Sequence, residues 1–369
     1  MHRRLGVAGA VVDGEVIAGD VVIDADAGII VAIGVGGGHG CGLAVPGFVD
    51  IQVNGFAGAN FAGCDRVGYE AASMAMAATG VTSFLATFPS PAPATILAAL
   101  DLAAAVVATP LGGAHCVGVH LEGPFLAPTR KGAHVEANLR VPNISLADTW
   151  LARGPVVLMT LAPELPGALD LIAHLRARDV AVALGHTDVD AAGAHAAYDA
   201  GAQAHTHVWN AHRPITSRDP GPGAVALTRS DAAPCMIADL VHVAAESLLV
   251  SVGAAHDRYV IVTDAVAFAG LAPGTELASH PGVSVRDGAV RLPDGTIAGS
   301  AGTLDASVRT LVGLGRPLPE VVAAVTSRPA ALIGRTDLGR ITVGGRADVV
   351  VLTDDLHVNA TYLGGRRVA

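Results

Sequence analysis

The sequence predicts an α/β protein, a (β/α)₈ TIM-like barrel that carries a small β-sandwich domain. Apolar runs of strand length recur eight times between residues 48 and 263, and they lack the alternation of a half-exposed sheet, as expected of parallel strands buried on both faces. Helix-length stretches separate these runs, which gives the β-then-α order of a barrel. Short runs bounded by Gly and Asp occupy both ends of the chain. The eight runs are Phe48–Val53, Val81–Phe88, Cys116–Leu121, Val156–Leu161, Val180–Leu184, Ala204–Val208, Cys235–Leu240 and Tyr259–Thr263.

The first 45 residues contain short β-type runs, which predict a small antiparallel sheet. These runs are Gly6–Val12, Val16–Ile23 and Gly28–Ile33, and the apolar tail Arg346–Leu352 is expected to return and pair with them. The pattern changes at Pro46, where the longer apolar runs begin. We therefore expect one β-domain built from residues 1–45 and 336–369, and a barrel domain over residues 46–335.

Helices are expected between the barrel strands, at Tyr69–Thr79, Ile96–Val107, Ala168–Arg178 and Ala191–Ala200. An open doubly wound sheet is the alternative fold, but its first strand should lead into a Gly-rich phosphate loop, and residues 54–58 match that motif poorly. After the eighth run, Leu271–Ile297 reads as an insertion. It contains an expected hairpin, Val283–Arg286 and Ala289–Leu292 around Asp287-Gly288, and helices follow at Ala306–Leu314 and Pro319–Val325.

Composition excludes several classes of protein. The 369 residues are 51% hydrophobic and only 15% charged, which suits a large globular core. The 23 Lys and Arg against 33 Asp and Glu give a net charge of −10, which argues against nucleic acid or an anionic membrane as partner. No apolar run approaches the length of a membrane span. The four cysteines are scattered without a Cys-x-x-Cys motif, so we expect a cytoplasmic protein without disulfides.

Residues able to do chemistry follow the predicted strands, where the active sites of (β/α)₈ barrels lie. One carboxylate and two imidazoles from separate strand ends would form a Glu/His/His metal site with a position left for water. His205 and His207 would point to one face of a strand, so they are metal ligands, a proton-handling pair or hydrogen-bonded core histidines. The strand-end segments are His120–Pro124, Leu184–Asp188, His205–His207, Asp239–His242 and Val262–Ala265.

Motifs along nearly the whole chain resemble the N-acetylglucosamine-6-phosphate deacetylase family of the amidohydrolase superfamily. They occur in the family's order, from Pro-Gly-Phe-Val-Asp to Ile-Ala-Gly-Ser. The matching segments are residues 46–50, 80–84, 120–126, 131–134, 185–188, 206–211, 237–243, 262–265 and 297–300.

This resemblance implies a single divalent metal ion per subunit, held by Glu122, His186 and His207, with Asp264 as the general base. The Thr-His-x-x-Asn-Ala register assigns the metal to His207, which leaves His205 a hydrogen-bonded supporting role or a place in the barrel core. Zn²⁺ is the expected ion, and Fe²⁺, Co²⁺ and Mn²⁺ suit the same ligands.

The resemblance also implies a phosphorylated amino sugar as substrate and a homodimer as the assembly. Ala133 and His134 are expected to contact the substrate, His134 near the reacting carbonyl, and the Asn210-Ala211 backbone should lie beside the phosphate. Either subunit of the dimer could supply the Arg218 contact. The expected phosphate contacts are Arg218 and His242, and the expected acetyl-pocket residues are Thr303 and Leu304.

Some residues depart from the family pattern. Gln52 and Asn54 stand where many amidohydrolases carry a His-x-His motif for a second metal, so we expect a mononuclear site. His212 and Gly302 replace a Met and a larger apolar residue, which leaves the acyl and sugar specificity open. The expected activity is hydrolysis of N-acetylglucosamine 6-phosphate to glucosamine 6-phosphate and acetate. N-acetylgalactosamine 6-phosphate is the alternative substrate, and a non-catalytic scaffold is the alternative role.

Overall fold

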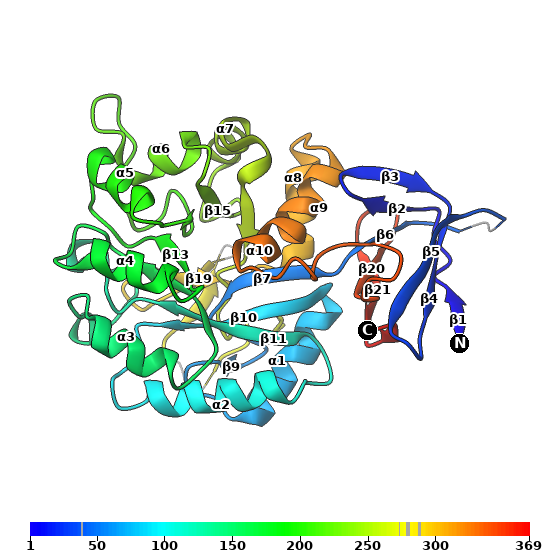
Figure 1. Cartoon of the computed structure of the whole chain (residues 1–369), viewed down its shortest axis with the longest axis horizontal. Coiled ribbons are helices and arrows are strands. Elements are labelled where there is room, and N and C mark those ends of the chain that lie inside the picture. Colours follow the sequence, from blue (N-terminus) through cyan, green and yellow to red (C-terminus); the bar gives the residue numbers. More distant parts are fainter. Residues whose placement is uncertain (38–39, 273, 278–280, 287–288) are drawn as a thin grey trace.

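The computed structural model describes residues 1–37, 40–272, 274–277, 281–286 and 289–369. A barrel with helices around it forms the larger body, and a smaller β-body beside it holds both termini (Figure 1). No helix among the described residues has the length and apolarity needed to cross a bilayer.

The barrel is an eight-stranded parallel sheet whose strands follow one another in chain order, so the predicted fold is confirmed. Small side chains such as Ala181, Ala183 and Ala204 are buried with Val49 and Ile51 in one apolar cluster. The sixth strand is shorter than expected, because the chain leaves the sheet after His205 rather than after Val208. The strands are β7 (Phe48–Val53), β10 (Val81–Pro89), β11 (His115–Glu122), β12 (Val156–Leu161), β13 (Ala181–Leu184), β14 (Ala204–His205), β15 (Ala233–Ile237) and β16 (Val260–Val262).

Strands β16 and β7 meet where the sheet closes, without a regular ladder between them. A buried carboxylate bridges this seam, since Asp50 Oδ2 accepts a hydrogen bond of 2.6 Å from the Thr263 hydroxyl. Just beyond the strand, the backbone N–H of Asp264 donates to the carbonyl of Gln52 at 3.0 Å. The seam therefore fixes Asp264 relative to the first strand.

Helices cover the outside of the barrel, and those predicted from the sequence are present with small shifts of their ends. Several begin at side-chain caps: Asp65, Asn143 and Asp190 each accept a hydrogen bond from a backbone N–H in the first turn. The helices are α1 (Arg66–Ala78), α2 (Ile96–Ala108), α3 (Ile144–Leu151), α4 (Ala168–Arg176), α5 (Ala191–Asp199), α6 (Gly221–Thr228), α7 (Ala245–Ala255), α8 (Leu304–Gly313), α9 (Leu318–Val325) and α10 (Ser327–Leu332).

Two small antiparallel elements follow the first and last barrel strands. After β7, β8 (Gly55–Phe56) pairs with β9 (Ala59–Asn60). The insertion after β16 forms the expected hairpin from β17 (Ser284–Arg286) and β18 (Ala289–Arg291), and β19 (Ile297–Ser300) pairs with β18. The predicted turn at Asp287-Gly288 lies outside the described residues.

The terminal segments form two sheets, in agreement with the predicted β-sandwich domain, but the runs of the first 45 residues do not form one antiparallel sheet as expected. The expected run Val16–Ile23 breaks at Gly19, which has a φ of +105° and leaves no room for a Cβ against Gly34. The C-terminal tail does pair with the N-terminal segment, and the domain boundaries at 45/46 and 335/336 stay predictions. One sheet is ordered β1 (His2–Arg4), β4 (Asp20–Asp24), β5 (Ile29–Val35); the other is β22 (Arg366–Arg367), β21 (Val358–Leu363), β20 (Val349–Leu352), β6 (Leu43–Pro46), β2 (Gly9–Val12), β3 (Glu15–Ala18).

The free energy of unfolding of the wild type is expected to fall as the pH rises from 4 to 7, and the substitution Asp50→Asn should make this fall smaller. Burial raises the pKa of Asp50 from 3.8 to about 7, so over this range the folded state holds a proton that the unfolded chain has released. The free energy of unfolding of the wild type therefore falls as the pH rises, by at most about 4 kcal/mol from this group. Urea unfolding at pH 5 and pH 7 measures the effect, and an equal decline in both proteins would contradict it.

Candidate active site

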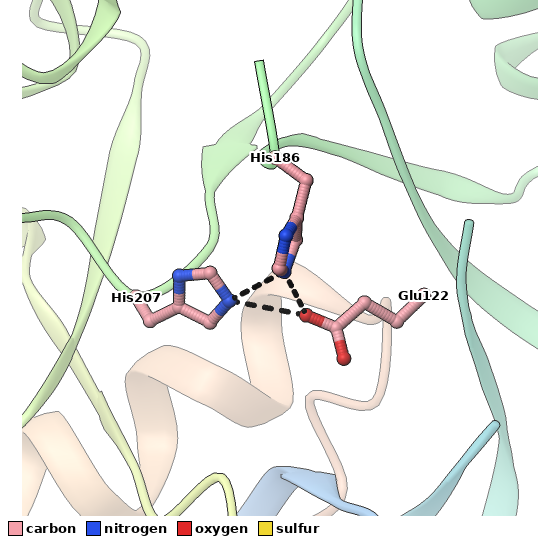
Figure 2. Close-up of side chains that lie close together, drawn as sticks. All are labelled: Glu122, His186 and His207. Carbon is pink, nitrogen blue, oxygen red and sulfur yellow. Dashed lines mark hydrogen bonds and ion pairs between the residues drawn. The ribbon is translucent and has the colours of Figure 1, made fainter. Parts of the chain in front are cut away.

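Three side chains from the ends of the third, fifth and sixth barrel strands converge at one point (Figure 2). Glu122 ends β11, while His186 and His207 lie in the turns that follow β13 and β14. The two histidine Nε2 atoms are 3.1 Å apart, and Glu122 Oε1 lies 3.2 Å from that of His186 and 3.1 Å from that of His207. The structure thus brings together the three residues predicted as metal ligands.

The donor chemistry of this trio fits a bound cation. His186 Nδ1 lies 3.0 Å from the Arg130 carbonyl, which can only accept a hydrogen bond. In the neutral ring, His186 Nε2 is then also an acceptor, yet it faces a carboxylate oxygen. A metal ion with bonds of about 2.0–2.1 Å separates tetrahedral ligand atoms by about 3.3 Å, close to the distances observed here.

Asp264 lies next to the trio, held by amide donors. Asn54 Nδ2 donates to Asp264 Oδ1 at 2.7 Å, and Gln52 Nε2 donates to Glu122 Oε1 at 3.0 Å. Burial and the negative charge of Glu122 raise the pKa of Asp264 to about 6, while His207 and Asn54 oppose this shift. From the sequence, Gln52 and Asn54 were considered only as weak ligands, and their role as donors to these two carboxylates was missed.

His134 approaches the trio from the loop after β11. Its ring centroid is 4.4 Å from that of His186, and its Nδ1 forms a hydrogen bond of 2.8 Å with the Ser90 hydroxyl. Burial, reinforced by His186, lowers the pKa of His134 to about 3, so the ring is neutral near pH 7. Ser90 follows the second strand, and the strand-end rule that found the other residues would also have found it.

A cavity of about 680 Å³ opens over these groups. Its polar part includes all four predicted residues of the two substrate loops, Ala133, His134, Asn210 and Ala211, together with His242. The insertion adds apolar residues to the lining, namely Val283, Val290, Leu292 and Ile297.

Three other predicted substrate residues lie outside this lining. Arg218 is exposed in the loop before α6, and it does not reach the cavity of its own chain. Thr303 precedes α8, and Leu304, its first residue, is fully buried. Their proposed roles stay predictions.

The neighbouring histidines 205 and 207 differ from the expectation in two respects. His207 lies in the turn after β14 rather than on a strand, with a φ of +25°. His205 is fully buried, which fits the predicted place in the barrel core, and neither of its ring nitrogens has a hydrogen-bond partner among the described residues, so the alternative of a hydrogen-bonded support is not met. Its ring instead packs edge-to-face on His212, with centroids 5.0 Å apart.

A barrel with a Glu/His/His trio and a neighbouring aspartate at the ends of its strands defines the class of metal-dependent barrel hydrolases. The model of the Amidohydrolase family matches residues 43–368, and the chain belongs to this family.

Its relatives within the family include amino-sugar phosphate deacetylases. The chain is 37% identical to N-acetylglucosamine-6-phosphate deacetylase from Rattus norvegicus, over 89% of this chain and 84% of the relative. N-acetylgalactosamine-6-phosphate deacetylase from Escherichia coli O157:H7 is 34% identical, over 88% and 87% of the two chains. A structure of N-acetyl-D-glucosamine-6-phosphate deacetylase from Mycobacterium smegmatis, a mutant in complex with N-acetyl-D-glucosamine-6-phosphate, superposes with a TM-score of 0.93, at 32% identity and over 100% and 99% of the two chains.

The substitution Glu122→Gln should remove the bound metal. The wild type is expected to hold about one divalent ion per chain after metal-replete expression, and the variant loses the only anionic ligand of the trio. Plasma mass spectrometry of the dialysed proteins measures the content. His205→Gln is the matched control, because it changes a buried histidine two residues from His207 and should keep the metal. Full metal content in a folded Glu122→Gln protein would contradict the assignment.

Proposed function

We propose that this chain hydrolyses the acetamide of N-acetylglucosamine 6-phosphate to glucosamine 6-phosphate and acetate, as part of amino-sugar metabolism. The observation that carries the proposal is the Glu122, His186 and His207 trio with Asp264 beside it, at the floor of a cavity that suits a sugar phosphate in size. The deacetylases among its relatives support this substrate class.

A divalent ion on the trio would lower the pKa of a water molecule and polarise the acetamide carbonyl. Asp264 takes the proton from the attacking water and delivers it to the sugar nitrogen as the C–N bond breaks, which makes the amine a competent leaving group. Asn54 keeps Asp264 Oδ1 fixed during both transfers. His134, neutral and buried beside the trio, contacts the substrate near the carbonyl.

Zn²⁺ is the ion we propose, since two imidazoles and one carboxylate with bonds near 2 Å are typical of catalytic zinc sites. Fe²⁺, Co²⁺ and Mn²⁺ are compatible with the same ligands. Gln52 and Asn54 donate hydrogen bonds to carboxylates here, which supports a single ion per subunit.

The phosphate is proposed to lie against the Asn210-Ala211 backbone and His242, with Arg218 supplied by the partner subunit of a homodimer. Arg218 is exposed and does not line the cavity of its own chain, which favours a role across an interface. Thr303 and Leu304 are proposed to shape the acetyl pocket from the start of α8, and Ala133 to contact the sugar beside His134.

N-acetylgalactosamine 6-phosphate is the second candidate substrate, and the Escherichia coli relative of that specificity favours it. The two sugars differ only in the orientation of the 4-hydroxyl group, so discrimination between them depends on the residues that contact this hydroxyl. A scaffold without activity is disfavoured, because the ligand trio is present and the candidate base lies beside it in the same cavity.

The substitution Asp264→Asn should lower kcat for N-acetylglucosamine 6-phosphate by about 10²–10⁴-fold, the usual contribution of a general base. The amide is isosteric and keeps the seam between β7 and β16, so the metal content should remain that of the wild type. Acetate release and metal analysis on the same preparation test both points. Activity within threefold of the wild type would exclude Asp264 as the base.

Arg218→Ala should raise KM for the phosphorylated sugar by about tenfold, the loss of one charge-assisted contact, and leave KM for N-acetylglucosamine unchanged. If Arg218 acts across a dimer, mixing the Arg218→Ala protein with the inactive Asp264→Asn protein restores a wild-type KM. In a mixed dimer, the subunit with an intact Asp264 receives the intact arginine of its partner. No restoration in mixtures that demonstrably exchange subunits would place the contact within one chain.

A further inference from the structure

His242 and Asp239 form a buried pair at the wall of the cavity, after β15. Asp239 Oδ2 accepts a hydrogen bond of 2.6 Å from His242 Nδ1. The His242 side chain is only 5% exposed, and its Nε2 atom has no partner among the described residues although the residue lines the cavity. One nitrogen of this ring is therefore fixed, and the other is left for a ligand.

A single carboxylate holds both the backbone and the ring of this turn. Asp239 Oδ1 accepts hydrogen bonds from the backbone N–H groups of Val241 at 2.9 Å and His242 at 2.8 Å. The turn includes Leu240 in the left-handed region, with a φ of +61°. Asp239 thus compensates a strained backbone and sets the orientation of the imidazole at the same time.

The other basic groups of the cavity lining are already engaged. Arg130 forms hydrogen bonds with Asp188 at 2.8 and 2.7 Å. His134 forms a hydrogen bond of 2.8 Å through Nδ1 with the Ser90 hydroxyl and packs edge-to-face on His186. His186 and His207 belong to the metal trio. Among the described residues that line the cavity, His242 is thus the side chain placed to offer positive charge to a phosphate.

A phosphate oxygen can only accept a hydrogen bond from this ring. Since the Asp239 carboxylate takes the proton of Nδ1, a neutral His242 would present a lone pair at Nε2 and repel the phosphate. Donation from Nε2 requires the imidazolium, whose burial is costly without a counter-charge. Although burial acts to raise it, the pKa of Asp239 is lowered by the hydrogen bond from His242 and by those from the backbone.

We propose that Asp239 is a positioning residue that holds His242 as an imidazolium and directs its Nε2–H toward the phosphate of the substrate. This inference rests on the proposed function. Asp239 favours phosphorylated over unphosphorylated sugars through His242, without contacting either sugar itself. In the Asp239→Asn variant, the amide oxygen still accepts hydrogen bonds from the backbone N–H groups of the turn. The amide nitrogen then faces His242 Nδ1 and donates to it, which stabilises a neutral ring.

The test compares kcat/KM for N-acetylglucosamine 6-phosphate and for N-acetylglucosamine in the metal-loaded enzyme. Asp239→Asn should lower the ratio of the two values about tenfold, through KM of the phosphorylated sugar, because a charge-assisted hydrogen bond becomes a neutral one. The metal content and kcat should stay at wild-type levels. Asp305→Asn, which removes a carboxylate paired with Arg309 on α8, is the matched control and should leave the ratio unchanged.

A double-mutant cycle separates positioning from a general structural effect. His242→Asn should lower the ratio by a similar factor, and adding Asp239→Asn to it should lower it no further. Equal losses on both sugars, or independent effects that multiply in the double variant, would overturn the proposal. If Asp239→Asn does not fold, His242→Asn alone decides, since an unchanged ratio overturns the proposal. Absence of deacetylation by the wild type would instead refute the proposed function.

Discussion

The chemistry of this barrel depends on a backbone constraint at the ends of its strands. Ser90, His186, His207 and Asp264 all have positive φ values, between +25° and +49°. Each follows a different strand, and the left-handed conformation turns the chain out of the sheet at that residue. A residue other than glycine in this region costs about 1–2 kcal/mol, so four such residues are tolerated only because buried hydrogen bonds and packing fix each turn.

Those hydrogen bonds also connect the turns to one another. Gln52 accepts from Thr206, which adjoins His207, and donates to Glu122, so one amide links three segments of the barrel. Asn54 extends the connection to Asp264, and Ser90 extends it to His134. The carboxylates and imidazoles are thus oriented before any ligand arrives, as preorganised catalysis requires.

The sequence predicted the barrel from its buried apolar runs, and the polar residues directly after them indicated a Glu/His/His metal site. The assignment of that site to Glu122, His186 and His207 came from the resemblance to the deacetylase family. It did not predict the donors at Gln52 and Asn54, whose partners lie 70 and 210 residues away. The end of β14 was also placed too late, since Thr206 and Val208 favour a strand by propensity, while the turn is imposed by tertiary contacts. The break at Gly19 depends on the approach of Gly34 from another strand, which no local pattern reveals.

Charge balance explains why phosphate recognition must be local. The chain carries a net charge of −10, so long-range electrostatics oppose the approach of a sugar phosphate. At the metal site, a divalent cation would be balanced by Glu122 and an ionised Asp264, which leaves little net attraction. The Asp239–His242 pair is also neutral overall, so its contribution is a directed hydrogen bond rather than a field. Selectivity for the phosphate therefore requires hydrogen-bond donors directed at its oxygens, such as the proposed donor His242, which lines the cavity while its counter-ion Asp239 does not.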